Sequence, residues 1–218
     1  MKILKTVAAA AAAACLAAAS MSSHAGLVMT IDDLSTAGVD WTSGPLPSGS
    51  VAFHGGTVGT WTLSNSTGVG NGWSSIFGID LNSVSASSTA GGTLRITFTE
   101  TDLNFGSLGP LTVDSSIGGT TQGTISYSSW IDDANAAFGH GQQLFSGTSS
   151  GGAFAASGSA LAAASDPFSL TLQVDITHVG AKLTSFDFGA TVPEPGTLAL
   201  LSIAMLGAGV ATRRTAKR

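Results

Sequence analysis

Apolar and polar residues alternate along two long stretches of the chain. From Leu94 to Thr99 and from Phe168 to Thr177, every second side chain is apolar. A period of two is the pattern of a β-strand that buries one face and exposes the other. No apolar stripe with the helical period of 3.6 residues extends over a comparable length. The pattern therefore predicts an all-β domain.

Shorter alternating runs predict eight further strands, separated by Gly and Ser pairs that are typical of turns. A sheet of such strands leaves one apolar face wet unless a second sheet covers it. We therefore expect residues 26–191 to form an antiparallel β-sandwich of jelly-roll type, in which 148–166 could be a loop, a Gly-rich strand pair or a short helix. The additional strands are expected at 27–31, 51–53, 58–63, 76–84, 111–117, 123–130, 142–146 and 183–188.

The first 25 residues have the pattern of a secretory signal peptide. Lys2 and Lys5 precede an unbroken run of small and apolar residues at 7–19. Small residues then occupy the positions that a signal peptidase reads, which predicts cleavage between Ala25 and Gly26. Because Cys15 is the one Cys of the chain and lies in this segment, we expect the exported protein to contain no disulfide.

The last residues have the pattern of a membrane helix followed by a basic stop. The sixteen residues 197–212 carry no charge, which is a short span for a bilayer that needs about 20 apolar residues. By the positive-inside rule, the cations that follow would stay in the cytoplasm and everything before the span would lie outside. These cations are Arg213, Arg214, Lys217 and Arg218.

A proline-rich motif stands directly before this span. Two prolines around Glu194 exclude a helix interior or a central strand, so the motif is expected to be an extended hinge that a peptidase can bind. The order of motif, apolar span and basic cluster closely resembles the PEP-CTERM sorting signal of bacterial exosortase substrates, and this resemblance covers 192–218. The motif residues are Val192, Pro193, Glu194, Pro195 and Gly196.

The resemblance implies a route and a partner. Proteins with this signal are recognised by an exosortase in the inner membrane of a Gram-negative bacterium. They are cleaved near the Pro-Glu-Pro and released or transferred to the cell surface, where they are commonly associated with exopolysaccharide or biofilm. The same signal is also catalogued as an ice-binding protein C-terminal domain, but a sorting tail does not itself indicate ice binding.

Composition sharpens the picture of the exported part. Gly, Ser and Thr make up 84 of the 218 residues, which disfavours helices. The whole chain has a net charge of −5, but 26–192 carries twelve acidic residues against Arg95 and Lys182, a net charge of −10. Such a domain repels nucleic acid, anionic lipid and anionic polysaccharide unless divalent cations bridge them.

No catalytic or zinc motif stands out. The histidines at 54, 140 and 178 are scattered and lack the spacing of metal ligands. Glu100 and Asp102 lie two residues apart on an expected strand, which would suit a glycosidase pair, but neither carries an active-site signature, and a charged strand end before a turn is the preferred explanation. We therefore expect no enzymatic activity and no catalytic residue, with a polysaccharide hydrolase as a remote alternative.

Two other features suggest binding. The pairs Asp32-Asp33 and Asp132-Asp133 could contribute to a structural calcium site, although neighbouring residues of a strand point to opposite faces. Trp41 and Trp73 lie in Gly- and Ser-rich segments and could stack on sugar rings. The leading hypothesis is a non-enzymatic surface or matrix protein without a cofactor, and the alternative is a carbohydrate-binding module. Ice binding is remote, because the Thr residues at 120–124 form no regular ladder.

Overall fold

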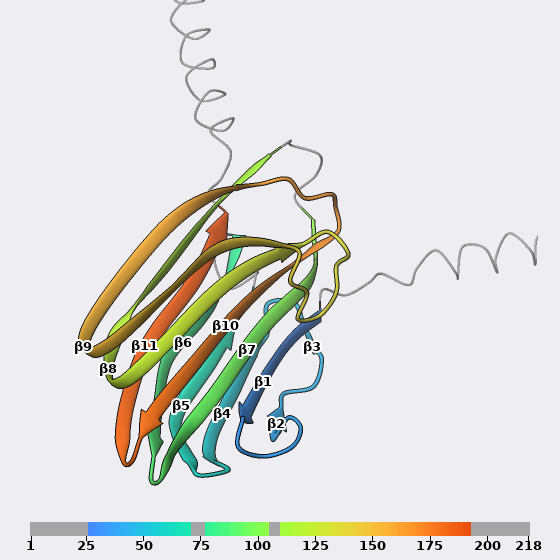
Figure 1. Ribbon diagram of the computed structural model, residues 1–218. Coiled ribbons are helices and arrows are strands. Elements are labelled where there is room, and N and C mark those ends of the chain that lie inside the picture. Colours follow the sequence, from blue (N-terminus) through green and yellow to red (C-terminus); the bar gives the residue numbers. More distant parts are fainter. Residues whose placement is uncertain (1–25, 71–76, 105–109, 193–218) are drawn as a thin grey trace, which may run out of the picture.

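A computed structural model describes residues 26–70, 77–104 and 110–192 of the chain, and within them every regular element is a β-strand (Figure 1). The expected class, an all-β antiparallel fold, is confirmed. The strands are β1 (Gly26–Asp33), β2 (Trp41–Thr42), β3 (Leu46–Pro47), β4 (Val51–Val58), β5 (Trp61–Val69), β6 (Phe77–Ser88), β7 (Gly91–Leu103), β8 (Leu111–Asp132), β9 (Gln142–Ala162), β10 (Phe168–Val179) and β11 (Lys182–Val192).

The strands form two layers that share one long strand. The second half of β8 pairs with β10, and its first half pairs with β11. The front layer therefore runs β1, β7, β10, β8, and Figure 1 shows these strands side by side. The back layer runs β4, β5, β6, β11, β8. Strand β9 follows β8 along both halves, so it ends both layers on the same flank.

The bend that carries β8 and β9 from one layer to the other is made by glycines. The β8–β9 register shifts between Thr121 and Thr124, opposite Gly151 and Gly152. These two glycines have φ angles of +62° and +92°, which residues with a Cβ rarely adopt. The Gly-rich segment at 148–166, whose structure the sequence left open, is thus mainly the second half of an edge strand.

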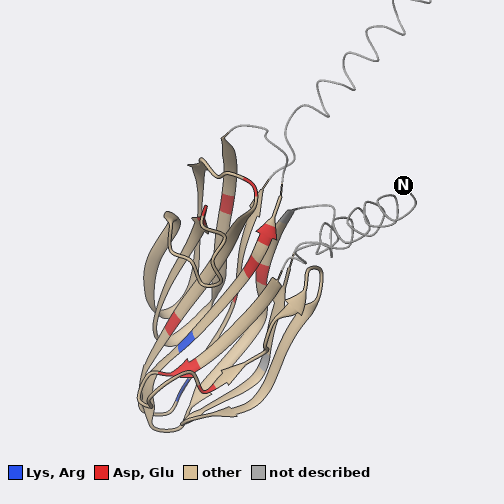
Figure 2. Cartoon of the chain, turned by 90° about the vertical axis from the view of Figure 1, so that its right-hand side faces the viewer, with Lys and Arg blue, Asp and Glu red and all other residues tan. Residues whose placement is uncertain are grey.

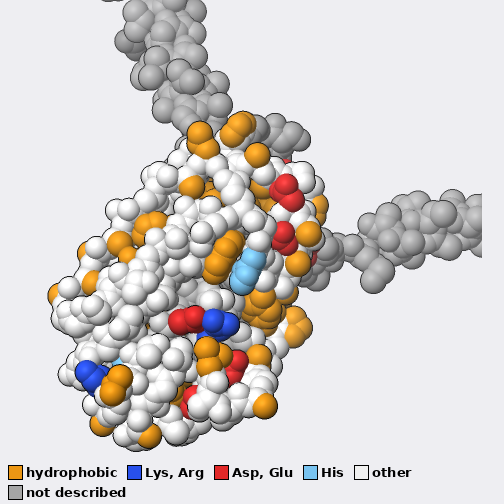
Figure 3. Space-filling view, in the orientation of Figure 1, with side chains coloured by type: hydrophobic (Ala, Val, Ile, Leu, Met, Phe, Trp, Pro, Cys, Tyr) orange, Lys and Arg blue, Asp and Glu red, His pale blue; other side chains and the backbone are white. Residues whose placement is uncertain are grey.

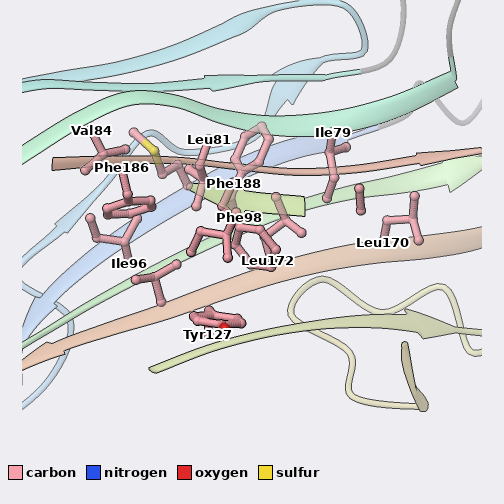
Figure 4. Close-up of a cluster of buried hydrophobic side chains, with 14 of the residues drawn as sticks. Ile79, Leu81, Val84, Ile96, Phe98, Tyr127, Leu170, Leu172, Phe186 and Phe188 are labelled. Atoms are coloured by element: carbon pink, nitrogen blue, oxygen red, sulfur yellow. The ribbon is translucent and has the colours of Figure 1, made fainter. Parts of the chain in front are cut away.

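Large apolar side chains fill the space between the layers. Figure 4 shows Phe98 and Leu172 of the front layer against Phe186 and Phe188 of the back layer, and all four are at most 1% exposed. Burying one such side chain contributes about 1.5–3 kcal/mol. The alternation in β7, β10 and β11 puts these residues inside and their polar neighbours outside, so the core follows from the period of two.

One predicted strand is wrong in part, and two predicted terminal segments lie where the structure gives no description. The segment 58–63, expected as one strand, contains the turn between β4 and β5 at Gly59 and Thr60. The signal peptide 1–25 and the membrane helix 197–212 lie outside the described residues. Within the described part, no helix has the length and apolarity to cross a membrane.

Candidate functional site

A groove of about 830 Å³ lies on the back layer and is lined by β5, β6, β11 and β8. It forms on the outer surface of this layer, away from the core. On β6, Ile79 and Leu81 point inward, so Asp80 between them points outward. The same alternation turns Asp114 and Asp187 outward on β8 and β11.

The strand register brings these outward residues together. Asp80, Gly189 and Ser116 are direct neighbours across β6, β11 and β8. In the next row, Thr191 lies between Gly78 and Asp114. Neighbouring strands are about 4.8 Å apart, so the first row places Asp80 and Ser116 about 10 Å apart, on either side of Gly189, and the second row places Thr191 directly beside Asp114.

Glycines keep the floor of the groove low. Gly78, Gly118 and Gly189 occupy outward positions in its lining and present backbone instead of a side chain. A Cβ built on Gly118 would have Phe154 O as its nearest neighbour, at 3.8 Å, so the space above this residue is open. A flat polar molecule could therefore lie directly against the backbone of β8 and β11.

Carboxylates form the polar walls, and no Lys or Arg is among the lining residues. Burial raises the pKa of Asp80, the hydrogen bond from Asn82 lowers it and the charge of Asp187 raises it again, with a net rise. The Asn82 Nδ2 lies 3.3 Å from Asp80 Oδ2. Asp114 Oδ1 accepts a hydrogen bond of 2.5 Å from Ser159 Oγ on β9. The groove is thus rich in acceptors, which suits a ligand rich in hydroxyl donors.

Most residues of the expected sorting signal lie beyond the described part. Val192 is the last residue of β11 and is buried, and it pairs with Phe77 of β6. The rest of the motif, Pro193 to Gly196, and the basic residues after 212 fall outside the described residues, as does Ala25. Gly26 is the first residue of β1, and its nitrogen donates to Thr101 Oγ1 at 3.1 Å.

The tryptophans are arranged differently from the expectation. Trp41 is half-buried, and its ring packs at 4.6 Å against the ring of His54, so it is not a free platform. Trp73 lies outside the described residues. Trp130 points outward from the front layer and stacks on the exposed ring of His140, with centroids 4.1 Å apart. This pair is a surface aromatic feature that the sequence analysis did not single out.

Glu100 and Asp102 do not form a pair. Glu100 is fully buried, and its Oε1 accepts a hydrogen bond of 2.6 Å from Ser48 Oγ. Asp102 has a φ angle of +58°, which breaks the alternation of the strand. Its Oδ1 instead accepts a hydrogen bond of 2.7 Å from Asn135 Nδ2. The β7–β10 register also shifts between Glu100 and Leu103, and this bulge explains why two carboxylates two residues apart bind different segments.

Three of the four residues in the two aspartate pairs, all except Asp32, accept hydrogen bonds from other described residues. Asp33 is buried at the end of β1, while Asp32 is half-buried and points to the opposite face. Asp132 Oδ2 accepts from Ala136 N at 3.2 Å, and Asp133 Oδ1 accepts from Ser165 N at 2.9 Å. Among the described residues, no three His, Cys, Asp or Glu side chains lie close enough together to hold a metal ion.

The groove residues were missed because their signal is topological. Asp80, Asp114 and Asp187 each occupy a polar position of an alternating run, so their outward direction could be predicted from the sequence. Their common location depends on the order β6, β11, β8, which places the strand of Asp187 between the strands of residues 107 and 73 positions earlier in the chain.

The comparisons with known proteins identify the C-terminal signal. The model of the PEP-CTERM protein-sorting motif matches residues 191–214, which confirms the resemblance expected from the sequence. No curated protein matches the chain.

Solved structures with a similar arrangement of strands have low sequence identity. The carbohydrate-binding module TmCBM61 in complex with beta-1,4-galactotriose is 10% identical with a TM-score of 0.35, over 62% of this chain and 90% of that one. The K1 cleaved adhesin domain of Lys-gingipain from Porphyromonas gingivalis W83 is 9% identical with a TM-score of 0.34, over 68% and 100%. The tailspike protein 4 domain of bacteriophage CBA120 is 13% identical with a TM-score of 0.35, over 62% of this chain and 20% of that one. Likeness at this level carries no argument about function.

Proposed function

Because the chain carries a PEP-CTERM protein-sorting motif, we propose that it is an exported protein which an exosortase sorts to the cell surface or the extracellular matrix of a Gram-negative bacterium. The signal peptide 1–25 directs export, and the helix 197–212 holds the chain in the inner membrane until processing. Support comes from the position of the motif, which begins where β11 ends at Val192. The folded domain, of the jelly-roll type, is therefore complete before the segment that the exosortase reads.

The exported domain binds a neutral polysaccharide of the matrix in the groove of the back layer. The carrying observation is that Asp80, Asp114 and Asp187 line one groove of about 830 Å³ with a backbone floor and without a cation. Carboxylates accept hydrogen bonds from sugar hydroxyls, and charge-assisted hydrogen bonds of this kind are stronger than neutral ones. Figure 2 shows how strongly acidic residues outnumber basic ones, so an anionic polymer would be repelled.

In this proposal the protein acts by binding and not by catalysis. The buried Glu100 is bonded to Ser48 and lies outside the groove lining, which removes the sequence-based reason for a hydrolase. Exposure of neutral matrix polysaccharides to the purified protein should release no reducing ends. A release that depends on Asp80 would replace the binding proposal with an enzymatic one.

The sorting route is tested by changing the motif. Pro193, Glu194 and Pro195 are replaced together by Ala, and the tail is followed by immunoblot in a host that has an exosortase. We expect the variant to accumulate as the longer form in the membrane. Unchanged processing, with the same short product as the wild type, would overturn the route.

The binding proposal is tested by filling the groove without disturbing the fold. Gly118→Val places a side chain where the nearest heavy atom to the new Cβ is 3.8 Å away, and Val suits a strand. In native gels, a neutral polysaccharide should slow the migration of the wild type, and an anionic one should not. The variant should need an at least tenfold higher concentration of the neutral polysaccharide for the same slowing. Ser128→Val on the front layer is the control. Equal retardation of both variants would exclude this groove.

A further inference from the structure

The outer edge of β9 is a long row of backbone groups without a partner strand. Among the described strands, β9 pairs with β8 alone, and it runs for 21 residues. Figure 1 shows it as the outermost strand on the left flank. The N–H and C=O groups of such an edge can pair with another strand.

Strand β9 has register shifts of its own, near Leu144 and at Gly151, but its second half, 152–162, is a longer regular stretch than the other edges offer. The front edge at β1 is covered by the short strands β2 and β3. The back edge at β4 has a register shift between His54 and Gly56, and Gly56 has a φ angle of +138°. Bulges and short strands hinder pairing with another chain. Between Gln142 and Ala162, in contrast, there is no Pro and no charged residue.

The uncharged segment is longer than the strand itself. Residues 134–165 contain no Asp, Glu, Lys or Arg, although the exported part carries a net charge of −10. In Figure 3, side chains on most of the β9 flank are white or orange. Two copies of so acidic a domain repel each other over most of their surface, and this flank is where they can approach.

The bend of β9 makes the edge self-complementary. Its first half ends the front layer, its second half ends the back layer, and Gln142 Nε2 donates to Leu161 O at 2.8 Å to hold the two ends together. A two-fold axis perpendicular to both layers would pair each half of β9 with the same half of a second copy, antiparallel. About 20 residues per copy would take part, the number that a stable interface of standard size uses.

We propose that the protein forms a symmetric dimer through β9, in which both layers continue across the interface. The outward side chains of the edge are small, as at Ser146, Thr148 and Ser157, so two strands can approach without a steric conflict. This dimer depends on neither the sorting route nor the ligand of the groove.

Charge placed on the edge tests the dimer. Sedimentation of the full chain in detergent should give the mass of two copies, and adding Ser146→Lys together with Ser157→Lys should raise the dissociation constant at least tenfold. The matched control places the same charges on β8, with Ser128→Lys, a cross-strand partner of Ser146, and Thr112→Lys. A monomeric wild type, a dimer that survives the β9 changes, or equal loss in the control would each overturn the proposal.

Disulfide cross-linking tests whether the two β9 strands of the dimer pair in antiparallel orientation. In a Cys15→Ser background, single Cys residues replace Ser146, Thr148 and Ser150 in turn, with Ser128→Cys as the control. With the two-fold axis at the middle of the first half of β9, antiparallel pairing brings one of these positions next to its own copy, so we expect one position to form a disulfide-linked dimer well above the others. Equal cross-linking at all three, or none above the control, would contradict the pairing.

Discussion

The carboxylate of Asp187 on β11 accepts a hydrogen bond of 2.5 Å from the backbone nitrogen of Ser83 on β6. Ser83 has a φ angle of +53°, and the β6–β11 register shifts at this point. The contact thus joins a groove carboxylate to the backbone irregularity that shapes one wall. Substitutions of Asp187 can therefore distinguish its structural role from its role in the groove.

Replacing Asp187 should change both stability and the titration of its neighbour. Asp187→Ala removes the acceptor of the Ser83 N–H and should lower the free energy of unfolding by about 1 kcal/mol, measured by urea denaturation. Because the charge of Asp187 raises the pKa of Asp80, the variant should lower that pKa, as followed by carboxyl NMR. Asp187→Asn keeps an acceptor and should shift the Asp80 pKa with a smaller loss of stability. An unchanged Asp80 titration in both variants would disprove the coupling.

Two adjacent glycines should respond in opposite ways to the same substitution. A Cβ on Gly119 would lie 2.1 Å from Ser185 O, so Gly119→Ala should lower the free energy of unfolding by about 1–3 kcal/mol. A Cβ on Gly118 meets no atom closer than 3.8 Å, so Gly118→Ala should raise it by about 0.5 kcal/mol. Thermal unfolding of both variants decides this, and similar losses would contradict the packing of β8 against β11.

Asp33 should be essential for joining the layers. Its Oδ1 accepts from Ser35 and its Oδ2 accepts from Thr60 N at 3.0 Å, in the turn between β4 and β5. Burial raises the pKa of Asp33, but the hydrogen bonds from Thr60 and Ser35 outweigh it and lower the pKa overall. A depressed carboxyl pKa contributes stability above about pH 3.9, which is lost as the pH falls through the folded value.

Removing the Asp33 carboxylate should strongly lower the stability of the fold. Asp33→Ala should lower the free energy of unfolding by about 2–4 kcal/mol, because charged hydrogen bonds are lost at a fully buried position. Asp133→Ala, at an exposed position, is the matched control and should cost less than about 1 kcal/mol. The comparison is made by urea denaturation at pH 7, and equal losses would refute the role of Asp33.

His178 should make the protein less stable in mild acid. The ring is buried, with Nδ1 at 2.8 Å from Ser88 Oγ and Nε2 at 2.8 Å from Thr184 Oγ1. Burial, aided by the charge of Lys182, lowers its pKa. The unfolded state then binds more protons just below pH 6.5, so stability is full above this pH and falls as the pH decreases toward the folded pKa.

The slope of the free energy of unfolding against pH measures the contribution of His178. Between pH 6.5 and the folded pKa, one histidine contributes a loss that approaches about 1.4 kcal/mol per pH unit. His178→Gln should be less stable at neutral pH and should reduce this dependence without abolishing it, because burial lowers the pKa of His54 as well. His140→Gln, at an exposed position, is the control for the substitution. Urea denaturation at several values between pH 5 and pH 8 makes the comparison. An unaltered slope in His178→Gln would contradict the assignment.

The local pattern predicted the long strands because each of them buries one face, but 111–117 and 123–130, expected as two strands, form the single strand β8. The inward residues of 94–98 and 168–176 are those that the alternation selects. Thr99 shows where this reasoning ends: it lies on the outward face of β7 but is buried, because the loop after β8 covers it and Phe138 N donates to its Oγ1 at 3.2 Å. Coverage by a distant loop leaves no local signal in the sequence.

The candidate site could be predicted only in part. The outward direction of Asp80, Asp114 and Asp187 follows from the period of two, whereas their meeting in one groove needs the strand order. The missed turn at Gly59 has a similar cause. Gly59 has a φ angle of +56°, and a Cβ at this position would also lie 2.2 Å from Asp33 Oδ2, so both the turn and a contact between the two layers favour glycine here.

The position of β11 has a mechanical consequence. This strand lies in the interior of the back layer, between β6 and β8, and its end adjoins the sorting motif. When the chain is held by that end, a pull from flowing water enters along the strand axis and loads both neighbouring ladders in shear, so that many hydrogen bonds must break together. A strand at the margin would instead peel away one bond at a time. A domain held in this way would be tethered through an interior strand, which resists being drawn out better than a strand at the edge of the layer.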